Sequence, residues 1–131
     1  MRGAHFLVCV AAVLGLTGCP GTLEHREDFE GGVPADILGP SCAKAQCHDA
    51  ETHAGKLDLS PDEGLRERLI DVPSSSGCGG KIVDTANPEM SLLYTKCLPN
   101  PACGTQMPQT GSLSETDIAD LLAWIQSLKE P

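Results

Sequence analysis

Large aromatic side chains are scarce in this sequence. Its 131 residues include one Trp, one Tyr and two Phe. A small domain with so few large side chains builds a thin hydrophobic core, and such domains usually need a disulfide, a metal or a cofactor to hold them together. The scarcity of aromatic residues therefore draws attention to the seven cysteines of the chain.

Positive charge is scarce as well. The chain has 9 Lys and Arg residues against 18 Asp and Glu residues, which gives a formal net charge of −9 at pH 7. An acidic chain of this kind does not hold nucleic acid or anionic lipid head groups through its charge. The excess of carboxylates favours a basic docking partner, and it also serves to keep an exported domain soluble.

Long hydrophobic runs are absent except at the start of the chain. The apolar run over residues 6–16 has the length of a signal-peptide core and is too short to span a bilayer. It leads into Leu-Thr-Gly followed by Cys19, which resembles the lipobox of bacterial lipoproteins. We therefore expect residues 1–18 to be a signal peptide and Cys19 to carry the lipid that anchors the protein in the bacterial cell envelope. Because Pro20 follows in place of an Asp, we expect the outer membrane, facing the periplasm. The alternative is an ordinary signal peptide that leaves Cys19 as a spare thiol.

The rest of the chain predicts a short tether and one small helical domain. Residues 19–33 are polar and glycine-rich, which is typical of a flexible linker between lipid and domain. Residues 34–131 show no internal repeat and no useful strand alternation, whereas several segments have helical periodicity. We therefore expect an all-α fold, a small domain of three to four short helices with large loops.

Local signals give the expected positions of the first two helices. Pro34 suits the start of a short helical turn, which Gly39 and Pro40 should end. Ser60 and the proline after it suit the cap and the first position of a second helix that reaches about residue 70.

The two later helices have clearer stripes of apolar side chains. Asn87 should start a helix whose inward side chains are Met90, Leu93, Tyr94 and Cys97. Ser114 should cap the last helix, because acidic residues follow it in the first turn. The inward stripe of that helix is Ile118, Leu121, Leu122, Ile125 and Leu128, with Trp124 beside it.

The number of cysteines limits which disulfide bonds can form. Cys9 leaves with the predicted signal peptide and Cys19 takes the lipid, so five cysteines remain. Three of these, Cys78, Cys97 and Cys103, are disulfide candidates, since neighbouring thiols in the bacterial envelope tend to oxidise. A bond between Cys78 and Cys103 would pin the long Pro/Gly loop that precedes the last helix. Cys97 with Cys103 is the competing pair, and the sequence leaves the choice open.

The other two cysteines lie beside a histidine, in the pattern Cys42-x4-Cys47-His48. Covalent attachment of haem needs two cysteine sulfurs for its vinyl groups and a histidine directly after the second cysteine as proximal iron ligand. The adjacency of Cys47 and His48 meets this need, and the four residues between the cysteines can form a turn. Met107, stiffened by Pro108, offers a thioether sulfur for the other side of the iron, which raises the reduction potential.

Four segments, in order, resemble a class I c-type cytochrome domain: "CAKAQCH", "GKLDLS", "CGTQMP" and "LSETDIADLLAWIQSL". The chain also resembles haem-binding lipoproteins of bacterial envelopes, which carry a widened Cys-x4-Cys-His motif and end in a helix with "WI". Over residues 34–128 the resemblance implies one covalent haem c, with Cys42 and Cys47 as thioethers, His48 as proximal and Met107 as distal ligand. By position, the pocket should be lined by Leu57, Leu59, Leu92 and Trp124.

The resemblance implies electron transfer between envelope partners. No enzyme activity is expected, because an iron with a methionine ligand has no open position for a substrate, and no Gly-x-Ser-x-Gly elbow is present.

Two other interpretations of the cysteines stay open. Cys42 and Cys47 could join in a disulfide, with His48 as an ordinary surface histidine. The protein would then be a haem-free, disulfide-stapled envelope lipoprotein acting as a binding or structural module. A zinc site, with His53 as a reserve ligand, is less favoured, because closed structural sites use four Cys or His ligands and the later cysteines are irregularly spaced.

Overall fold

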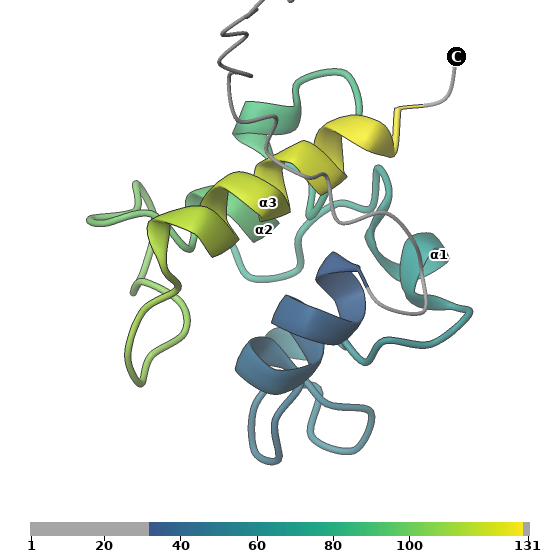
Figure 1. The fold of residues 1–131 in the computed structure, drawn as a ribbon, viewed down its shortest axis with the longest axis vertical. Coiled ribbons are helices and arrows are strands. Elements are labelled where there is room, and N and C mark those ends of the chain that lie inside the picture. The colour runs from purple at the N-terminus through teal and green to yellow at the C-terminus, as the bar shows by residue number, and fades with distance from the viewer. Residues whose placement is uncertain (1–31, 130–131) are drawn as a thin grey trace, which may run out of the picture.

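The computed structural model describes residues 32–129 (Figure 1). The predicted signal peptide, the lipid site at Cys19 and residues 19–31 of the predicted tether lie outside this range. Val33, the last residue of the predicted tether, is buried. No helix in the described range is long and apolar enough to cross a membrane.

Six short helical elements follow one another along the described residues. The π-helix η1 spans Pro34–Cys42, and the α-helices α1, α2 and α3 span Leu65–Leu69, Leu92–Thr95 and Glu115–Ser127. Two 3-10 turns, η2 and η3, span Ala54–Lys56 and Pro88–Met90. The β structure found between residues 32 and 129 consists of isolated bridges, Ile70 with Val83 and Pro73 with Lys81. The prediction of a small all-α domain with short helices and large loops is confirmed.

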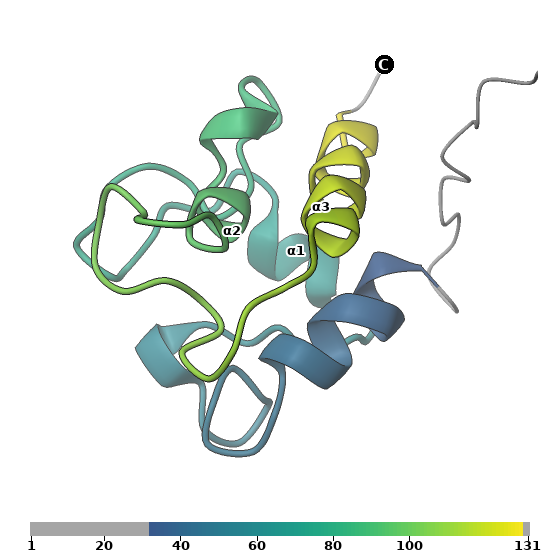
Figure 2. The same ribbon diagram turned by 60° about the vertical axis from the view of Figure 1, so that its left-hand side comes forward.

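The helix α3 packs against α2 and η3. Figures 1 and 2 show η1 in one half of the domain and α2 in the other, with α3 along one side. The long loop between α2 and α3 runs from the α2 half towards the η1 half (Figure 2). The chain thus brings the segment after η1 near the segment before α3, although the two are far apart in the sequence.

The core is thin and mainly aliphatic. Trp124 is the one aromatic residue among the buried side chains of the described range. The fully buried hydrophobic side chains come mostly from η1, α1 and α3, and they are Val33, Ile37, Leu38, Leu65, Leu69, Val83, Leu121 and Ile125. Such a core matches the expectation that this domain needs additional links between its loops.

The predicted cap of the last helix is confirmed. Ser114 Oγ accepts a hydrogen bond from the Asp117 backbone N–H at 3.0 Å, and Asp117 Oδ2 accepts one from the Ser114 N–H at 3.4 Å. This reciprocal pair satisfies two of the amide groups that a helix start leaves free. The helix ends at Ser127, and the buried Leu128 forms its C-cap.

The expected break at Gly39 and Pro40 does not occur. The helix η1 continues to Cys42 with π-type hydrogen bonding, and the Ala43 N–H donates to the Leu38 carbonyl at 2.8 Å. The wider π turn leaves room for the Pro40 ring, which would collide with the preceding turn of an α-helix. Burial of Leu38 and Cys42 favours this continuation over the local break.

The second helix begins later than predicted, at Leu65. The Ser60 side chain does not cap it, and a turn forms in which the Asp62 carboxylate accepts the Gly64 N–H at 2.8 Å. An aspartate that binds a nearby backbone amide in this way offers the chain an alternative to helix.

Met90 was expected in an inward stripe, and this prediction is wrong, since Met90 is 69% exposed. The chain changes from the 3-10 turn η3 to α2 at the buried Ser91, whose hydroxyl accepts the Asp84 N–H at 2.9 Å. This change shifts the helical phase, so Leu93 and Cys97 are buried while Met90 faces outward.

Candidate cofactor site

One cavity of about 580 Å³ opens between the segment after η1 and the loop before α3. Its lining includes all four residues predicted to hold a haem, namely Cys42, Cys47, His48 and Met107. The volume falls within the range of roughly 300–1,000 Å³ that is usual for cofactor and small-molecule sites. The structure therefore brings the predicted sulfur and imidazole groups to one place.

The four residues between the two cysteines form a compact turn. The Cys47 N–H donates to the Lys44 carbonyl at 2.9 Å, and the His48 N–H donates to the Cys42 carbonyl at 3.1 Å. Gln46 has a left-handed backbone with φ of 69°. The extra residues of the widened motif thus loop out, and both cysteines line the same cavity.

His48 is fixed by its backbone. Its carbonyl accepts the Leu59 N–H at 2.8 Å, and the Cys47 carbonyl accepts the Ala54 N–H at 2.9 Å, so the intervening chain closes into a loop. The imidazole lines the cavity, and its Nδ1 atom is buried without a hydrogen-bond partner among the described residues. An unsatisfied buried polar atom costs about 1–3 kcal/mol, so the packing around this turn holds the ring in place against that cost.

Met107 is held against the end of α2. Its backbone N–H donates to the Lys96 carbonyl at 2.7 Å, and the Lys96 Nζ donates to the Cys103 carbonyl at 2.7 Å. The Gln106 side chain donates to the Cys97 carbonyl at 3.1 Å. Three hydrogen bonds therefore hold the loop at the methionine and at residues that precede it. Lys96 and Gln106 carry no signal in the sequence, because their acceptors are backbone carbonyls whose approach depends on how the intervening loop folds back.

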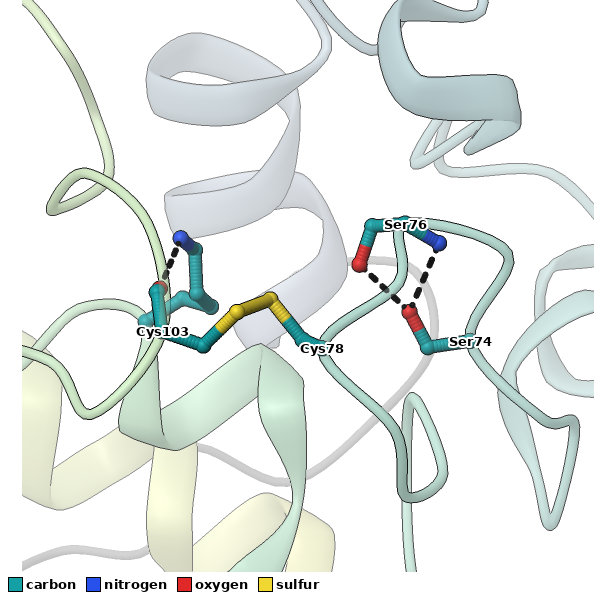
Figure 3. The surroundings of a disulfide bond; sticks show 5 residues. Ser74, Ser76, Cys78 and Cys103 are labelled. Carbon is teal, nitrogen blue, oxygen red and sulfur yellow. Dashed lines mark hydrogen bonds between the residues drawn. A yellow bond between two sulfur atoms is a disulfide. The ribbon is translucent and has the colours of Figure 1, made fainter.

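A disulfide joins Cys78 to Cys103, with 5.6 Å between their Cα atoms (Figure 3). Of the two pairings considered from the sequence, the structure has this one, and Cys97 is unpaired and buried. The bond links the serine-rich loop at residues 74–76 to the Met107 loop. Closing a loop of 25 residues stabilises a fold by about 3 kcal/mol.

Within residues 32–129 three cysteines are unpaired, and all three, Cys42, Cys47 and Cys97, line the cavity. Burial raises the pKa of Cys42 to about 11, with a further rise from Cys47 and a small opposing effect of Lys44. Burial also raises the pKa of Cys97 to about 12, and its thiol donates to the Leu93 carbonyl at 3.3 Å. Both buried thiols are therefore protonated at neutral pH and are poor nucleophiles. Cys47 is exposed, and it is not joined to Cys42.

The apolar wall follows the prediction in part. Leu57, Leu59 and Leu92 line the cavity, as expected. Trp124 does not, because it lies on the inward face of α3 and belongs to the buried core.

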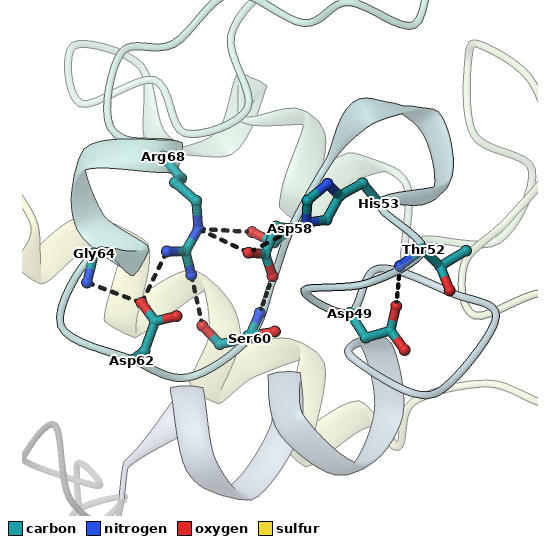
Figure 4. A network of polar contacts seen from close by, with 8 residues as sticks. All are labelled: Asp49, Thr52, His53, Asp58, Ser60, Asp62, Gly64 and Arg68. Atoms are coloured by element: carbon teal, nitrogen blue, oxygen red, sulfur yellow. Dashed lines mark hydrogen bonds and ion pairs between the residues drawn. The ribbon is translucent and has the colours of Figure 1, made fainter.

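A polar network braces the chain that carries two of these leucines (Figure 4). Arg68 donates to the Ser60 carbonyl at 2.8 Å and pairs with Asp62 Oδ1 at 2.8 Å. It also lies 3.5 Å from the carboxylate of Asp58. Burial alone would raise the pKa of Asp58, but hydrogen bonds from Ser60 and the charges of Arg68 and His53 outweigh it and lower this pKa. The network fixes the backbone on either side of Leu59.

His53, the reserve metal ligand, lies in this network and not in the cavity wall. Its Nε2 is 3.8 Å from Asp58 Oδ2, and its side chain is half exposed. No group of three or more His, Cys, Asp or Glu side chains within residues 32–129 is arranged to hold a metal ion. A haem of the His/Met-ligated cytochrome c kind would take only one His and one Met from the protein, so it does not require such a group.

Comparison of the chain with protein-family models, with curated proteins and with solved structures found no match.

Proposed function

We propose that this protein is an electron-transfer lipoprotein with a class I c-type cytochrome fold and one covalent haem c. Cys42 and Cys47 would hold the haem as thioethers, with His48 as proximal and Met107 as distal iron ligand. The observation that carries the proposal is that one cavity is lined by these four residues together.

The residues present fit such a group. The cavity offers two unpaired thiols, an imidazole and a thioether, and its wall is apolar at Leu57, Leu59, Ile82, Leu92 and Leu93. The turn after Cys42 presents both thiols to the cavity despite the widened spacing. The imidazole of His48 follows directly after Cys47 in the chain and lines the same cavity.

When bound, haem c supplies one-electron chemistry between ferric and ferrous iron. The protein itself would hold the donor groups in position and exclude water. The backbone hydrogen bonds of His48 and Met107 hold the chain at the two donor residues, and the leucine wall would shield a bound haem from water. Because His48 and Met107 would both be iron ligands, no ligand position would be left for a substrate, so we infer a carrier and no enzyme.

The location and partners are part of the same proposal. Cleavage before Cys19 and lipidation there would tether the domain to the outer membrane, facing the periplasm. A redox partner protein of the envelope would exchange electrons with it.

The alternative is a haem-free envelope module stapled by disulfides. The Cys78–Cys103 bond is compatible with it. The Cys42–Cys47 disulfide that this alternative calls for is not formed in the structure, where both thiols are free.

The deciding experiment uses the full chain, produced in a periplasm with an active haem-maturation system. We expect a Soret band that survives acid-acetone extraction and an intact mass equal to peptide, acyl groups and one haem. The double variant Cys42→Ser/Cys47→Ser should lose the retained colour, while Cys97→Ser, which removes the third thiol of the same cavity, should keep it. A colourless wild-type protein, with Cys42 joined to Cys47, would refute the proposal.

A further inference from the structure

Arg68 binds the backbone on both sides of Leu59. Its Nη2 donates to the Ser60 carbonyl at 2.8 Å, and its Nε donates to the Asp58 carbonyl at 3.3 Å (Figure 4). Residues 57–61 form neither helix nor turn, so regular structure does not fix the position of this segment. One side chain from α1 therefore holds the two carbonyls that flank Leu59.

The amide of Leu59 extends these contacts to the cavity. Its N–H donates to the His48 carbonyl at 2.8 Å, and its buried side chain lines the same cavity as the His48 imidazole. The other backbone bond of His48 runs from its N–H to the Cys42 carbonyl, which belongs to the same turn. The bond from Leu59 is therefore the one that ties the His48 backbone to a more distant segment.

The ion pair of Arg68 does not account for this arrangement. Arg68 Nη1 lies 2.8 Å from Asp62 Oδ1, but the Asp62 side chain is 51% exposed, and ion pairs at such positions contribute little to stability. Hydrogen bonds from a charged guanidinium are stronger than those between neutral groups, and its planar fork can bind two acceptors at once. The main effect of this side chain is therefore on the backbone that it binds.

We propose that Arg68 is a positioning residue for His48. By holding the two carbonyls that flank Leu59, the guanidinium keeps the Leu59 N–H on the His48 carbonyl. This bond in turn keeps the imidazole at its place in the cavity wall. Arg68 does not line the cavity, so it acts through the backbone. The part of His48 as an iron ligand rests on the proposed function, whereas the hydrogen bonds do not depend on it.

The test measures amide hydrogen exchange of the full chain, which does not require bound haem. Arg68→Lys keeps the charge but lacks the planar fork, so the Leu59 amide should exchange roughly tenfold faster than in wild type. Amides within α3 should exchange at the wild-type rate, because an opening at Leu59 leaves that helix intact. Arg66→Lys is the matched control in the same helix, since Arg66 forms no ion pair with another described residue. It should change neither rate.

A purely structural role of Arg68 gives a different result. If Arg68→Lys speeds the Leu59 amide and the α3 amides by the same factor, Arg68 only stabilises the fold and the positioning role is refuted. Asp62→Asn weakens the ion pair but leaves the bonds of Arg68 to the two carbonyls, so the Leu59 amide should keep its wild-type rate. An increase as large as that in Arg68→Lys would also overturn the proposal.

The haem-loaded chain adds a spectroscopic readout. Arg68→Lys should have a larger high-spin fraction in its ferric visible spectrum than Arg66→Lys, because a loosened His48 leaves the iron more often. Identical spectra of the two variants would refute the link from the Leu59 amide to the imidazole. A wild-type chain without haem would instead refute the proposed function, and the exchange rates would still decide whether Arg68 holds this backbone.

Discussion

The backbone N–H of Met107 donates a hydrogen bond to the carbonyl of Lys96 at 2.7 Å, and the side chain of the same lysine binds the Cys103 carbonyl. One residue at the end of α2 therefore holds the methionine loop at two points. The disulfide to Cys78 adds a third. A loop that is rich in proline and glycine acquires a fixed position in this way, although it contains no regular structure of its own.

Removing the Lys96 ammonium should loosen this loop. Lys96→Met keeps the length of the side chain and the backbone bond to Met107 but loses the bond to the Cys103 carbonyl. We expect a stability loss of about 1 kcal/mol. We also expect a weaker charge-transfer band of methionine-ligated ferric haem in the visible spectrum. Lys129→Met should change neither, and a Lys96→Met spectrum identical to wild type would contradict a positioning role.

The Cys78–Cys103 disulfide should be the main covalent stabilisation of this domain with its thin core. Loss of the bond should lower the free energy of unfolding by about 3 kcal/mol, measured by urea denaturation. Cys78→Ser, Cys103→Ser and the double variant should lose nearly the same amount, since all three remove one bond. A double variant that is much less stable than either single variant would show that the two cysteines act separately.

Some features of this fold are local and could be predicted from the sequence. The cap of α3 depends on Ser114 and Asp117, three residues apart, so its geometry is contained in one helical turn. The grouping of Cys42, Cys47 and His48 is equally local, because a short turn can bring these neighbours to one side of the chain. Met107 can be predicted as a ligand from its local sequence as well, because a methionine beside a proline in a long loop is rarely needed as core filler.

Other features depend on contacts between distant segments. The pattern Met90, Leu93 and Cys97 fits one helix, yet the chain changes helix type at Ser91 to satisfy the Asp84 amide, and Met90 turns outward. The role of Lys96 follows from a carbonyl that the disulfide brings within reach. Burial of Leu38 and Cys42 favours the continuation of η1 past Pro40. None of these outcomes has a signature in the local sequence.

Cys97 should make the protein sensitive to alkaline pH. Burial raises its pKa from 9.0 to about 12, so above pH 9 the thiol ionises in the unfolded chain while the folded chain keeps it protonated. The stability contributed by the buried thiol is complete below pH 9 and is lost between pH 9 and about pH 12, at about 1.4 kcal/mol per pH unit. Measured by urea denaturation, Cys97→Ala should lose less unfolding free energy between pH 8 and pH 10 than wild type, because the two proteins differ only in this thiol. Equal losses in the two proteins would contradict a buried thiol at this position.

The turn within the widened Cys-x4-Cys-His motif, to which we propose that haem is attached, depends on the backbone of Gln46. This residue has a φ of 69°, and a β-branched side chain in that conformation costs at least about 1–2 kcal/mol, whereas glycine adopts it freely. Gln46→Gly should therefore keep full stability and haem content. Gln46→Val should lose about 1–2 kcal/mol and retain less haem, because the turn no longer holds both cysteine sulfurs at the cavity. Ala45→Val, at the exposed neighbouring position without a positive φ, is the control and should behave as wild type. The measurement is the amount of haem retained per protein after acid-acetone extraction. If this amount is equal in all three variants, the turn is not the reason that the four-residue spacing allows haem attachment.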